Sequence, residues 1–261
     1  MKLIRFGLIA GLLGVSSTSI AGNLEAGEED LQTKGSDPSE IISRLEIRNE
    51  YLGLSNDGHL DQIYLRGDYA PTENIVFRLD LPLADGSREN SGNHFGMGDL
   101  ILGGRGKLEL TENLSWLLGT NFILDTAGSE VLGTGWNQIV PGTYLVWKPS
   151  RQWILSVGYE YAASFGGSDN NELEKISESL FRPGALYHLP KGFWLWLDPK
   201  IYINHEQGSD TAFVLEGEFG KVVTANVEVW LRGGGNVAGG EAGREERLGW
   251  KAEAGIRYLF E

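Results

Sequence analysis

The strongest constraint on the fold is an alternation of apolar and polar side chains, two residues in period, that runs through most of the chain. In RLEIRNEY (residues 44–51), Leu45, Ile47 and Tyr51 stand at odd positions, whereas arginine or glutamate fills every even one. Because successive side chains of a strand point to opposite sides, this pattern predicts a strand with one apolar and one charged face. The alternation recurs in twelve segments, near residues 43–51, 60–69, 75–83, 100–110, 114–125, 136–147, 153–161, 179–189, 193–204, 212–220, 227–233 and 248–260.

The connections between these segments are of two kinds, which alternate strictly. Short ones lie at residues 71–74, 111–113, 149–152, 190–192 and 224–226, and longer, more acidic ones lie at residues 55–59, 84–97, 126–135, 163–177, 205–210 and 234–247. Outer-membrane barrels have short periplasmic turns and longer extracellular loops. The sequence therefore predicts an all-β fold, an antiparallel transmembrane β-barrel of about twelve strands. A soluble β-sandwich is the competing fold, but ionic residues on nearly every polar face favour the barrel.

The chain divides into three predicted parts. Residues 1–21 read as a secretory signal peptide, since Lys2 and Arg5 precede a short apolar run and small residues end at Ala21. Residues 22–40 are acidic and lack aromatic residues, which predicts a flexible N-terminal segment. Residues 41–261 form the predicted barrel. Export and a barrel together predict the cell outer membrane as the location.

Composition excludes several other classes of protein. The formal charge is −14, and removal of the two signal-peptide cations gives −14 − 2 = −16, so nucleic acid is not an expected partner. The chain has no cysteine, which excludes disulfides and thiolate metal sites. After the signal peptide the longest apolar run is Phe193–Leu197, far below the roughly 20 residues of a membrane helix.

The last predicted strand explains how such a chain could reach its membrane. In GWKAEAGIRYLFE (residues 249–261), Ile256, Tyr258 and Phe260 share one face and Arg257 lies on the other. This end resembles the C-terminal β-signal of outer-membrane proteins, although Glu261 follows the aromatic residue. The resemblance implies the barrel-insertion machinery as a partner, and a closing strand predicts contact with outer-membrane lipid and lipopolysaccharide.

Longer stretches carry a resemblance at family level. They are residues 96–122 (GMGDLILGGRGKLELTENLSWLLGTNF), 139–148 (IVPGTYLVWK), 181–190 (FRPGALYHLP) and 254–260 (AGIRYLF). With these the whole mature chain resembles the MetA-pathway of phenol degradation family of outer-membrane proteins. The resemblance implies a channel or transporter-like role tied to small hydrophobic or aromatic compounds. It carries over no functional residue.

The only strong polar constellation is the set of charged side chains predicted to face the lumen. We expect these residues to line a passage and set its selectivity for a small-molecule solute, with no catalytic, cofactor-binding or metal site. They are Arg44, Glu46, Arg48, Glu50, Arg66, Asp68, Arg78, Asp80, Arg105, Glu160, Arg182, Lys200, Glu216, Glu218, Glu228, Arg232, Lys251, Glu253 and Arg257. Lys107, Glu109 and Asp198 share the same face in the pattern.

Two alternatives to a passive channel stay open. Barrels of eight strands are filled by side chains and those of sixteen or more hold aqueous channels, so a twelve-stranded lumen could be a plug. A lipid-acting hydrolase or deacylase is the other alternative, since His94 lies near Ser91 and Asp99, and His59 and His205 fall in other predicted outer loops. Nucleophile and base must approach within about 3 Å for that chemistry.

Four prolines lie inside predicted strands, at positions 82, 141, 183 and 199. Proline lacks the N–H that a β-ladder needs. Each proline therefore predicts a bulge or a local gap in the pairing.

Overall fold

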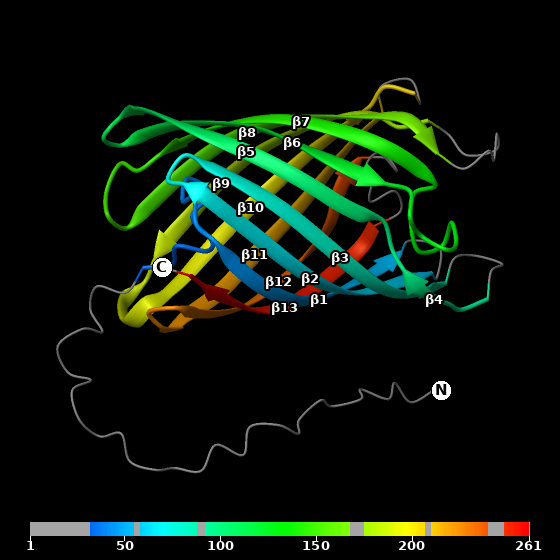
Figure 1. Ribbon diagram of the computed structural model, residues 1–261, viewed down its shortest axis with the longest axis horizontal. Helices are drawn as coiled ribbons and strands as arrows, with labels where there is room; N and C mark the ends of the chain where they lie inside the picture. The colour runs from blue at the N-terminus through cyan, green and yellow to red at the C-terminus, as the bar shows by residue number, and fades with distance from the viewer. Residues whose placement is uncertain are drawn as a thin grey trace, which may run out of the picture.

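The computed structural model describes residues 32–54, 58–87, 92–167, 175–206, 210–239 and 248–260, and its strands form one closed barrel (Figure 1). The signal-peptide prediction lies outside these residues. The strands are β1 (Arg44–Leu54), β2 (His59–Thr72), β3 (Ile75–Ser87), β4 (His94–Met97), β5 (Leu100–Thr111), β6 (Leu114–Leu124), β7 (Trp136–Trp147), β8 (Trp153–Gly167), β9 (Ser177–His188), β10 (Phe193–Asn204), β11 (Asp210–Thr224), β12 (Val227–Gly239) and β13 (Leu248–Leu259), with the 3₁₀ turn η2 (Pro190–Gly192) between β9 and β10. Within the described ranges no helix reaches the length and hydrophobicity that a bilayer crossing requires.

All neighbouring strands are antiparallel, and the sheet closes on itself through its first strand. Arg44 on β1 lies opposite Leu259 on β13 and opposite Asp68 on β2. The short β4 pairs only with β3, beside the end of β5, so the closed cylinder contains twelve strands. The predicted twelve-stranded antiparallel barrel is confirmed.

Several strands extend further than the alternation predicts. β3, β8 and β12 continue to Ser87, Gly167 and Gly239, into segments where the sequence predicts loops. A β-ladder is held by backbone groups and needs no apolar side chain, so a strand can continue after its period-two pattern has ended.

We call the end of the barrel with the tight turns the turn end, and the opposite end the loop end.

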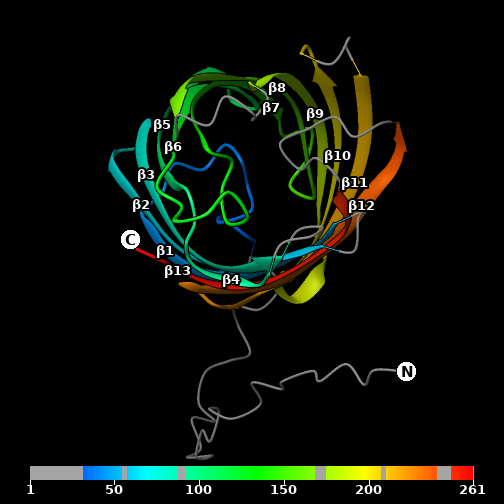
Figure 2. The ribbon, with the colours of Figure 1, turned by 90° about the vertical axis from the view of Figure 1, so that its right-hand side faces the viewer.

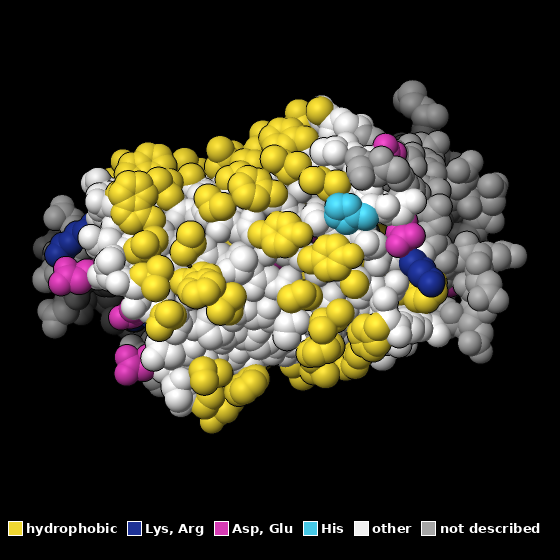
Figure 3. Space-filling model, turned by 90° about the horizontal axis from the view of Figure 1, so that it is seen from above, with side chains coloured by type: hydrophobic (Ala, Val, Ile, Leu, Met, Phe, Trp, Pro, Cys, Tyr) yellow, Lys and Arg dark blue, Asp and Glu magenta, His cyan; other side chains and the backbone are white. Residues whose placement is uncertain are grey.

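The outer surface of the barrel is apolar. Leu45, Ile47 and Phe77 are 45%, 51% and 56% exposed although they lie within strands. Figure 3 shows such side chains over the body of the molecule, with charged side chains gathered toward its two ends. Aromatic rings pair near the turn end, as Trp153 with Tyr187, Phe193 with Phe219 and Tyr258 with Phe260. A surface of this kind is suited to hydrocarbon, with aromatic side chains at its border with water.

The lumen is not uniformly ionic, because a second group of buried side chains inside it is apolar. We call it the inner apolar cluster; it consists of Leu117, Val146, Ile154, Leu186, Trp194, Val222 and Trp230. The partly buried rings of Tyr144 and Trp196 pack against it. One side of the lumen is therefore lined by aliphatic and aromatic groups. The charged positions of the sequence pattern do not predict this apolar lining.

The prolines interrupt the sheet without shifting its register. Between β7 and β8 the ladder runs from the pair Ile139 and Ala163 to the pair Gly142 and Glu160, and it skips Pro141. Between β9 and β10 it skips the stretch that contains Pro199. The same gap contains Pro183, and Pro82 lies between the end of the ladder with β5 and the start of the ladder with β4. The predicted interruptions at the four prolines are thus local gaps on one side of each strand.

A glycine on β11 permits close packing inside the lumen. A Cβ atom at Gly220 on β11 would overlap the fully buried indole of Trp194, whereas a Cβ at Gly217 on the same strand would meet only a backbone oxygen at 3.9 Å. We therefore expect Gly220→Ala to lower the free energy of unfolding by about 1–3 kcal/mol, the usual cost of overpacking. Urea unfolding of protein refolded in lipid vesicles measures the change. Gly217→Ala is the matched control, and equal losses in both variants would contradict the packing described.

Candidate functional site

Ion pairs cover the lumen wall formed by β1, β2 and β3. Asp68 accepts hydrogen bonds from Arg44 Nε at 2.8 Å and from Arg78 Nε and Nη2 at 2.9 and 3.0 Å. Arg66 donates two hydrogen bonds to Asp80, at 2.7 and 2.6 Å. Two carboxylates thus hold three guanidinium groups in fixed, partly bidentate geometry, which is the strongest form of such a contact.

A second set of ion pairs covers the wall formed by β10 to β13. The carboxylate of Glu216 lies 2.5 Å from Lys200 Nζ and 3.7 Å from Lys251 Nζ. Arg232 pairs with Glu218 at 2.5 Å. The strand register places these residues on neighbouring strands, with their side chains on the same inner face.

Cations and carboxylates lie at different depths in this wall. The carboxylate side chains of Asp80, Glu216 and Asp198 are 1%, 0% and 2% exposed, whereas Arg66, Arg232 and Arg182, which pair with them in that order, are 15%, 19% and 27% exposed. These three carboxylates are therefore recessed against the sheet, and the guanidinium groups paired with them lie closer to the space within the barrel.

The space between these walls is a cavity of about 370 Å³. Ten cations and six carboxylates border it, along with the rings of Tyr144, Trp196 and Trp230. Cavities of a few hundred Å³ are of the size that holds small molecules. The lumen at this level is thus neither filled completely by side chains nor purely apolar.

The structure places all nineteen predicted lumen residues on the inner face. Fifteen border the cavity: Arg44, Glu46, Arg48, Glu50, Arg66, Arg78, Arg105, Glu160, Arg182, Lys200, Glu218, Arg232, Lys251, Glu253 and Arg257. The remaining four, Asp68, Asp80, Glu216 and Glu228, are buried beneath the cations. Of the residues that share the pattern, Asp198 is buried against Arg182, while Glu109 lies near a turn with its side chain 67% exposed.

An N-terminal strap crosses the lumen at the turn end; we use this name for residues 32–43. Its residues 32–40 belong to the segment 22–40, for which the composition predicts flexibility, and residues 41–43 belong to the predicted barrel. Its described part runs inside the barrel, as the blue segment within the ring in Figure 2 shows. Residues 35–38 form part of the cavity wall. The composition of the strap does not predict this placement, because its binding partners lie far away in the sequence.

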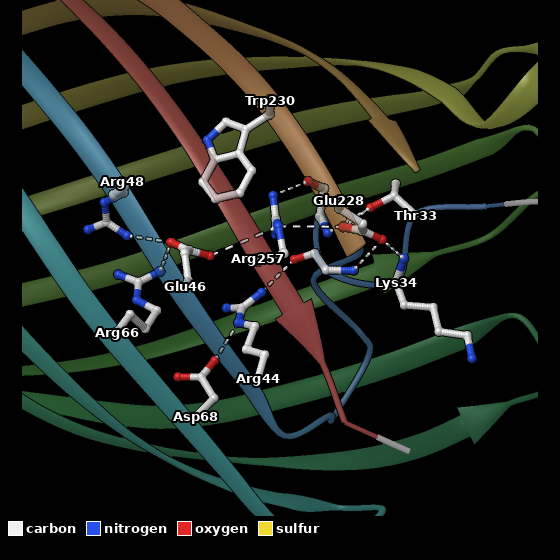
Figure 4. A network of polar contacts seen from close by, with 12 residues as sticks. Thr33, Lys34, Arg44, Glu46, Arg48, Arg66, Asp68, Glu228, Trp230 and Arg257 are labelled. Carbon is white, nitrogen blue, oxygen red and sulfur yellow. Dashed lines mark hydrogen bonds and ion pairs between the residues drawn. The ribbon is translucent and has the colours of Figure 1, made fainter. Parts of the chain in front are cut away.

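One carboxylate of the barrel wall captures the start of the strap (Figure 4). Glu228 on β12 accepts hydrogen bonds from Thr33 Oγ1 at 2.9 Å, from Lys34 N at 2.9 Å and from Gly35 N at 3.3 Å. Arg257 Nε lies 3.4 Å from the same carboxylate. Three hydrogen-bond donors and one guanidinium group around one buried carboxylate give this anchor its geometric specificity.

The middle of the strap is anchored on other strands. Ser36 Oγ donates to Glu218 at 2.6 Å and accepts from Arg257 Nη2 at 2.9 Å. On the opposite side Asp37 and Glu40 lie 2.7 and 3.2 Å from Lys148 Nζ, which follows β7. The strap is therefore tied to both walls of the barrel, and it narrows the lumen.

Lys148 gives this anchoring a dependence on pH. Burial disfavours its ammonium form, but the carboxylates of Asp37 and Glu40 outweigh that effect and raise the pKa of Lys148 above its ordinary value of 10.5. A raised lysine pKa stabilises the bound state below the ordinary value, and the contribution is lost as the pH rises through the higher one. We expect Lys148→Gln to loosen the strap at neutral pH and to increase single-channel conductance.

The control for this prediction is the pH profile of the two proteins. Conductance of the unmodified protein should rise toward that of Lys148→Gln as the pH passes above about 10.5, the ordinary lysine value. The variant should change little over the same range. A parallel rise in both proteins would show that Lys148 does not hold the strap.

At the loop end another segment folds into the barrel instead of extending outward. Residues 125–135, which we call the inner loop, lie within the ring in Figure 2 between β6 and β7. Leu132 is 2% exposed and packs in a cluster with Val131 and Ala84. The sequence predicts an outer loop at residues 126–135, and a loop connects β6 and β7 there. Its inward course was not predicted, and it arises because two adjacent aliphatic residues are buried against the inner face of β3.

A buried carboxylate fixes the position of the inner loop. Asp99 accepts hydrogen bonds from Thr134 N and Oγ1, at 2.7 and 3.0 Å, and from Ala127 N at 3.3 Å. Burial raises the pKa of Asp99, and the donors from Thr134 and Ala127 only partly oppose this effect. Asp99 therefore has a structural role in holding the inner loop.

The histidines considered for catalysis lie apart from one another. His205 Nε2 and Ser179 Oγ are 2.9 Å apart, and Tyr159 Oη also contacts this serine at 2.9 Å. His59 Nδ1 contacts Ser87 Oγ at 3.0 Å. The proposed partner of His94, Ser91, lies outside the described residues. Among the described residues no cluster of histidine and carboxylate groups could hold a metal ion.

Comparison with known proteins was made at the levels of sequence and fold. No family model and no curated protein matches the chain. The fold is similar to the COG4313 outer membrane channel from Pseudomonas putida F1, with a TM-score of 0.68 and 15% identity over 90% of this chain and 98% of that one. It is also similar to the NanC porin, with a TM-score of 0.60 and 11% identity over 83% and 100% of the two chains.

The KdgM porin shares the architecture as well, with a TM-score of 0.55 and 10% identity over 84% of this chain and 99% of that one. At identities this low the likeness concerns the fold alone. The resemblance to the phenol-degradation family therefore stays a prediction. The chain has the fold of outer-membrane channels and porins.

Proposed function

We propose that the protein is a passive outer-membrane channel for small solutes, with the turn end toward the periplasm and the loop end outside. The observation that carries this proposal is the cavity of about 370 Å³ inside a closed barrel, bordered by ten cations and six carboxylates. The apolar exterior supports a bilayer location, and the similarity to channels and porins supports passive passage. The charged lumen residues would set selectivity.

The mixed lining of the lumen supports passage of solutes that are partly apolar. Trp194 and Trp230 lie in the inner apolar cluster, and Trp196 packs against it at the edge of the cavity. A purely aqueous pore has no need of such a surface, whereas an aromatic or aliphatic solute gains free energy by burying area against it. The solute class that the sequence resemblance implies, small hydrophobic or aromatic compounds, is compatible with this wall.

The two alternatives have less support. A lipid-acting hydrolase centred on His94 would need Asp99 to orient the base, but the carboxylate of Asp99 is engaged by Thr134 and Ala127. A fully plugged barrel is hard to reconcile with a cavity of this volume. We therefore propose no catalytic role, no cofactor, and partners limited to lipid, the insertion machinery and the transported solute.

Single-channel recording in a planar lipid bilayer tests the proposal. Purified protein should insert and give discrete conductance steps, because a charged and partly open lumen admits ions. A sealed bilayer after insertion, together with no solute-dependent swelling of loaded liposomes, would reject passive transport and favour the plugged barrel.

A further inference from the structure

Among the described residues, one of the ten cations that border the cavity lacks an acidic partner. The other nine form ion pairs: Arg44 and Arg78 with Asp68, Arg48 with Glu46, Arg66 with Asp80, Arg182 with Asp198, Lys200 with Glu216, Arg232 with Glu218, Lys251 with Glu50 and Arg257 with Glu228. Arg105 on β5 forms no ion pair within the part of the chain that the structure describes. Its Nη2 donates to the backbone carbonyl of Glu40 at 2.9 Å.

The surroundings of Arg105 leave positive charge uncompensated. The charged side chains with the largest electrostatic effect on the Arg105 guanidinium are those of Arg78, Arg44 and Asp68. Asp68 already accepts hydrogen bonds from both of those arginines, so it cannot neutralise a third. Strand β5 and its neighbour β3 thus present a surplus guanidinium group to the cavity.

Hydrogen-bond donors without a partner are a second feature of the cavity wall. Among the described residues, Arg105 Nε, Arg48 Nε and Trp196 Nε1 are buried and have no hydrogen-bond partner. All three side chains border the cavity. A buried polar group without a partner costs about 1–3 kcal/mol, and native proteins rarely leave several together. Unsatisfied donors at Arg105 and in other parts of the cavity wall favour a ligand that carries acceptor atoms.

The rest of the cavity wall indicates what else the ligand must carry. Leu117, Val140, Tyr144 and Trp196 border the same space, and most of them belong to or pack against the inner apolar cluster. A ligand that meets both surfaces has an anionic group at one end and an apolar body at the other.

We propose that the lumen contains a binding site for a small organic monocarboxylate with an aromatic or aliphatic body. The guanidinium group of Arg105 pairs with the carboxylate, and such charge-assisted contacts are the strong ones. The body of the ligand lies against Tyr144 and Trp196. This inference builds on the proposed channel function and names the class of solute that the channel takes.

Isothermal titration of the full mature protein in nanodiscs tests the site, with benzoate as the probe, benzyl alcohol as its neutral counterpart and acetate as the carboxylate without a ring. Benzoate should bind more tightly than either. Arg105→Gln should raise the dissociation constant for benzoate by roughly tenfold or more, as loss of a charge-assisted hydrogen bond does. Arg105→Lys keeps the positive charge but loses the planar guanidinium group. Its dissociation constant for benzoate should lie between those of the unmodified protein and Arg105→Gln.

The matched control is Lys191→Gln, which removes one positive charge from an exposed turn and should leave benzoate binding unchanged. Equal affinity for benzoate and benzyl alcohol, or unchanged binding in Arg105→Gln, would overturn the site. Acetate binding as tight as that of benzoate would overturn the assignment of an apolar body. Binding at equilibrium does not require conduction, so benzoate binding without conductance would reject only the channel, and conductance without benzoate binding would reject only the site.

Discussion

Deleting residues 32–40 is expected to increase single-channel conductance severalfold while the barrel still folds. The strap crosses the lumen at the turn end and is tied to one wall by Glu228 and to the other by Lys148. It is not part of the β-ladder, which begins at Arg44. Its removal should therefore widen the passage without breaking strand pairing. Recording in planar bilayers, with refolding checked by circular dichroism, measures the effect.

Two further variants make this prediction specific to the strap. Deletion of residues 22–31 shortens the chain by a similar length but retains every contact described for residues 32–43, so its conductance should match that of the full mature protein. Thr33→Val removes one hydrogen bond to Glu228 and one from Ser36 N to Thr33 Oγ1, and it should have a much smaller effect than the deletion. Unchanged conductance after deletion of residues 32–40 would show that the narrowest part of the passage lies elsewhere, for instance at the inner loop.

Replacing Asp80 with Asn should cause the largest loss of stability of any single change discussed here. The Asp80 side chain is 1% exposed and holds Arg66 through two hydrogen bonds. Removal of one partner from a buried ion pair costs about 3–5 kcal/mol, because the remaining charge is left unpaired. We expect a value near the lower limit, since Glu46 lies 3.6 Å from Arg66 and compensates in part. Reversible urea unfolding in lipid vesicles measures this change in the free energy of unfolding.

An exposed ion pair in the same barrel provides the comparison. Glu109 lies 3.0 Å from Lys107, but its side chain is 67% exposed, and such pairs contribute less than about 1 kcal/mol. Glu109→Gln should therefore have little effect. The double replacement of Asp80 with Leu and Arg66 with Met should recover much of the loss, because no charge is left alone. Equal effects in Asp80→Asn and Glu109→Gln would mean that water screens the lumen wall as fully as it screens the rim.

The fold could be predicted from the sequence because two constraints act on every strand at once. One face must suit hydrocarbon and the other the lumen, so Leu45 and Ile47 alternate with charged residues in the first part of β1. No long-range information is needed to recognise this pattern. The same reasoning placed the charged lumen residues on the correct face, since the face of a residue follows from its parity within the strand.

The remaining features depend on contacts between distant parts of the chain. The strap looks like a solvated tail until Glu228, 195 residues from Thr33, supplies its partner. The inner loop carries the acidic and glycine-rich composition of an outer loop, and only Val131 and Leu132 hint that part of it is buried. Trp194 and Trp230 share the inner face with charged residues, and a pattern defined by charged residues alone does not include them. Their Nε1 atoms donate to Glu218 and Glu253, which only the assembled barrel reveals.

The central claim is that the strands separate hydrocarbon on the outside from water on the inside, and single-cysteine labelling tests it most directly. The chain has no cysteine of its own, so each introduced thiol reports one position. Spin labels at Ala252 and Ala254, which face outward on β13, should be relaxed by oxygen, which concentrates in lipid. Labels at Ser156 and Asn121, which border the cavity, should be relaxed by a water-soluble nickel chelate. The same response at all four positions would contradict the barrel described here.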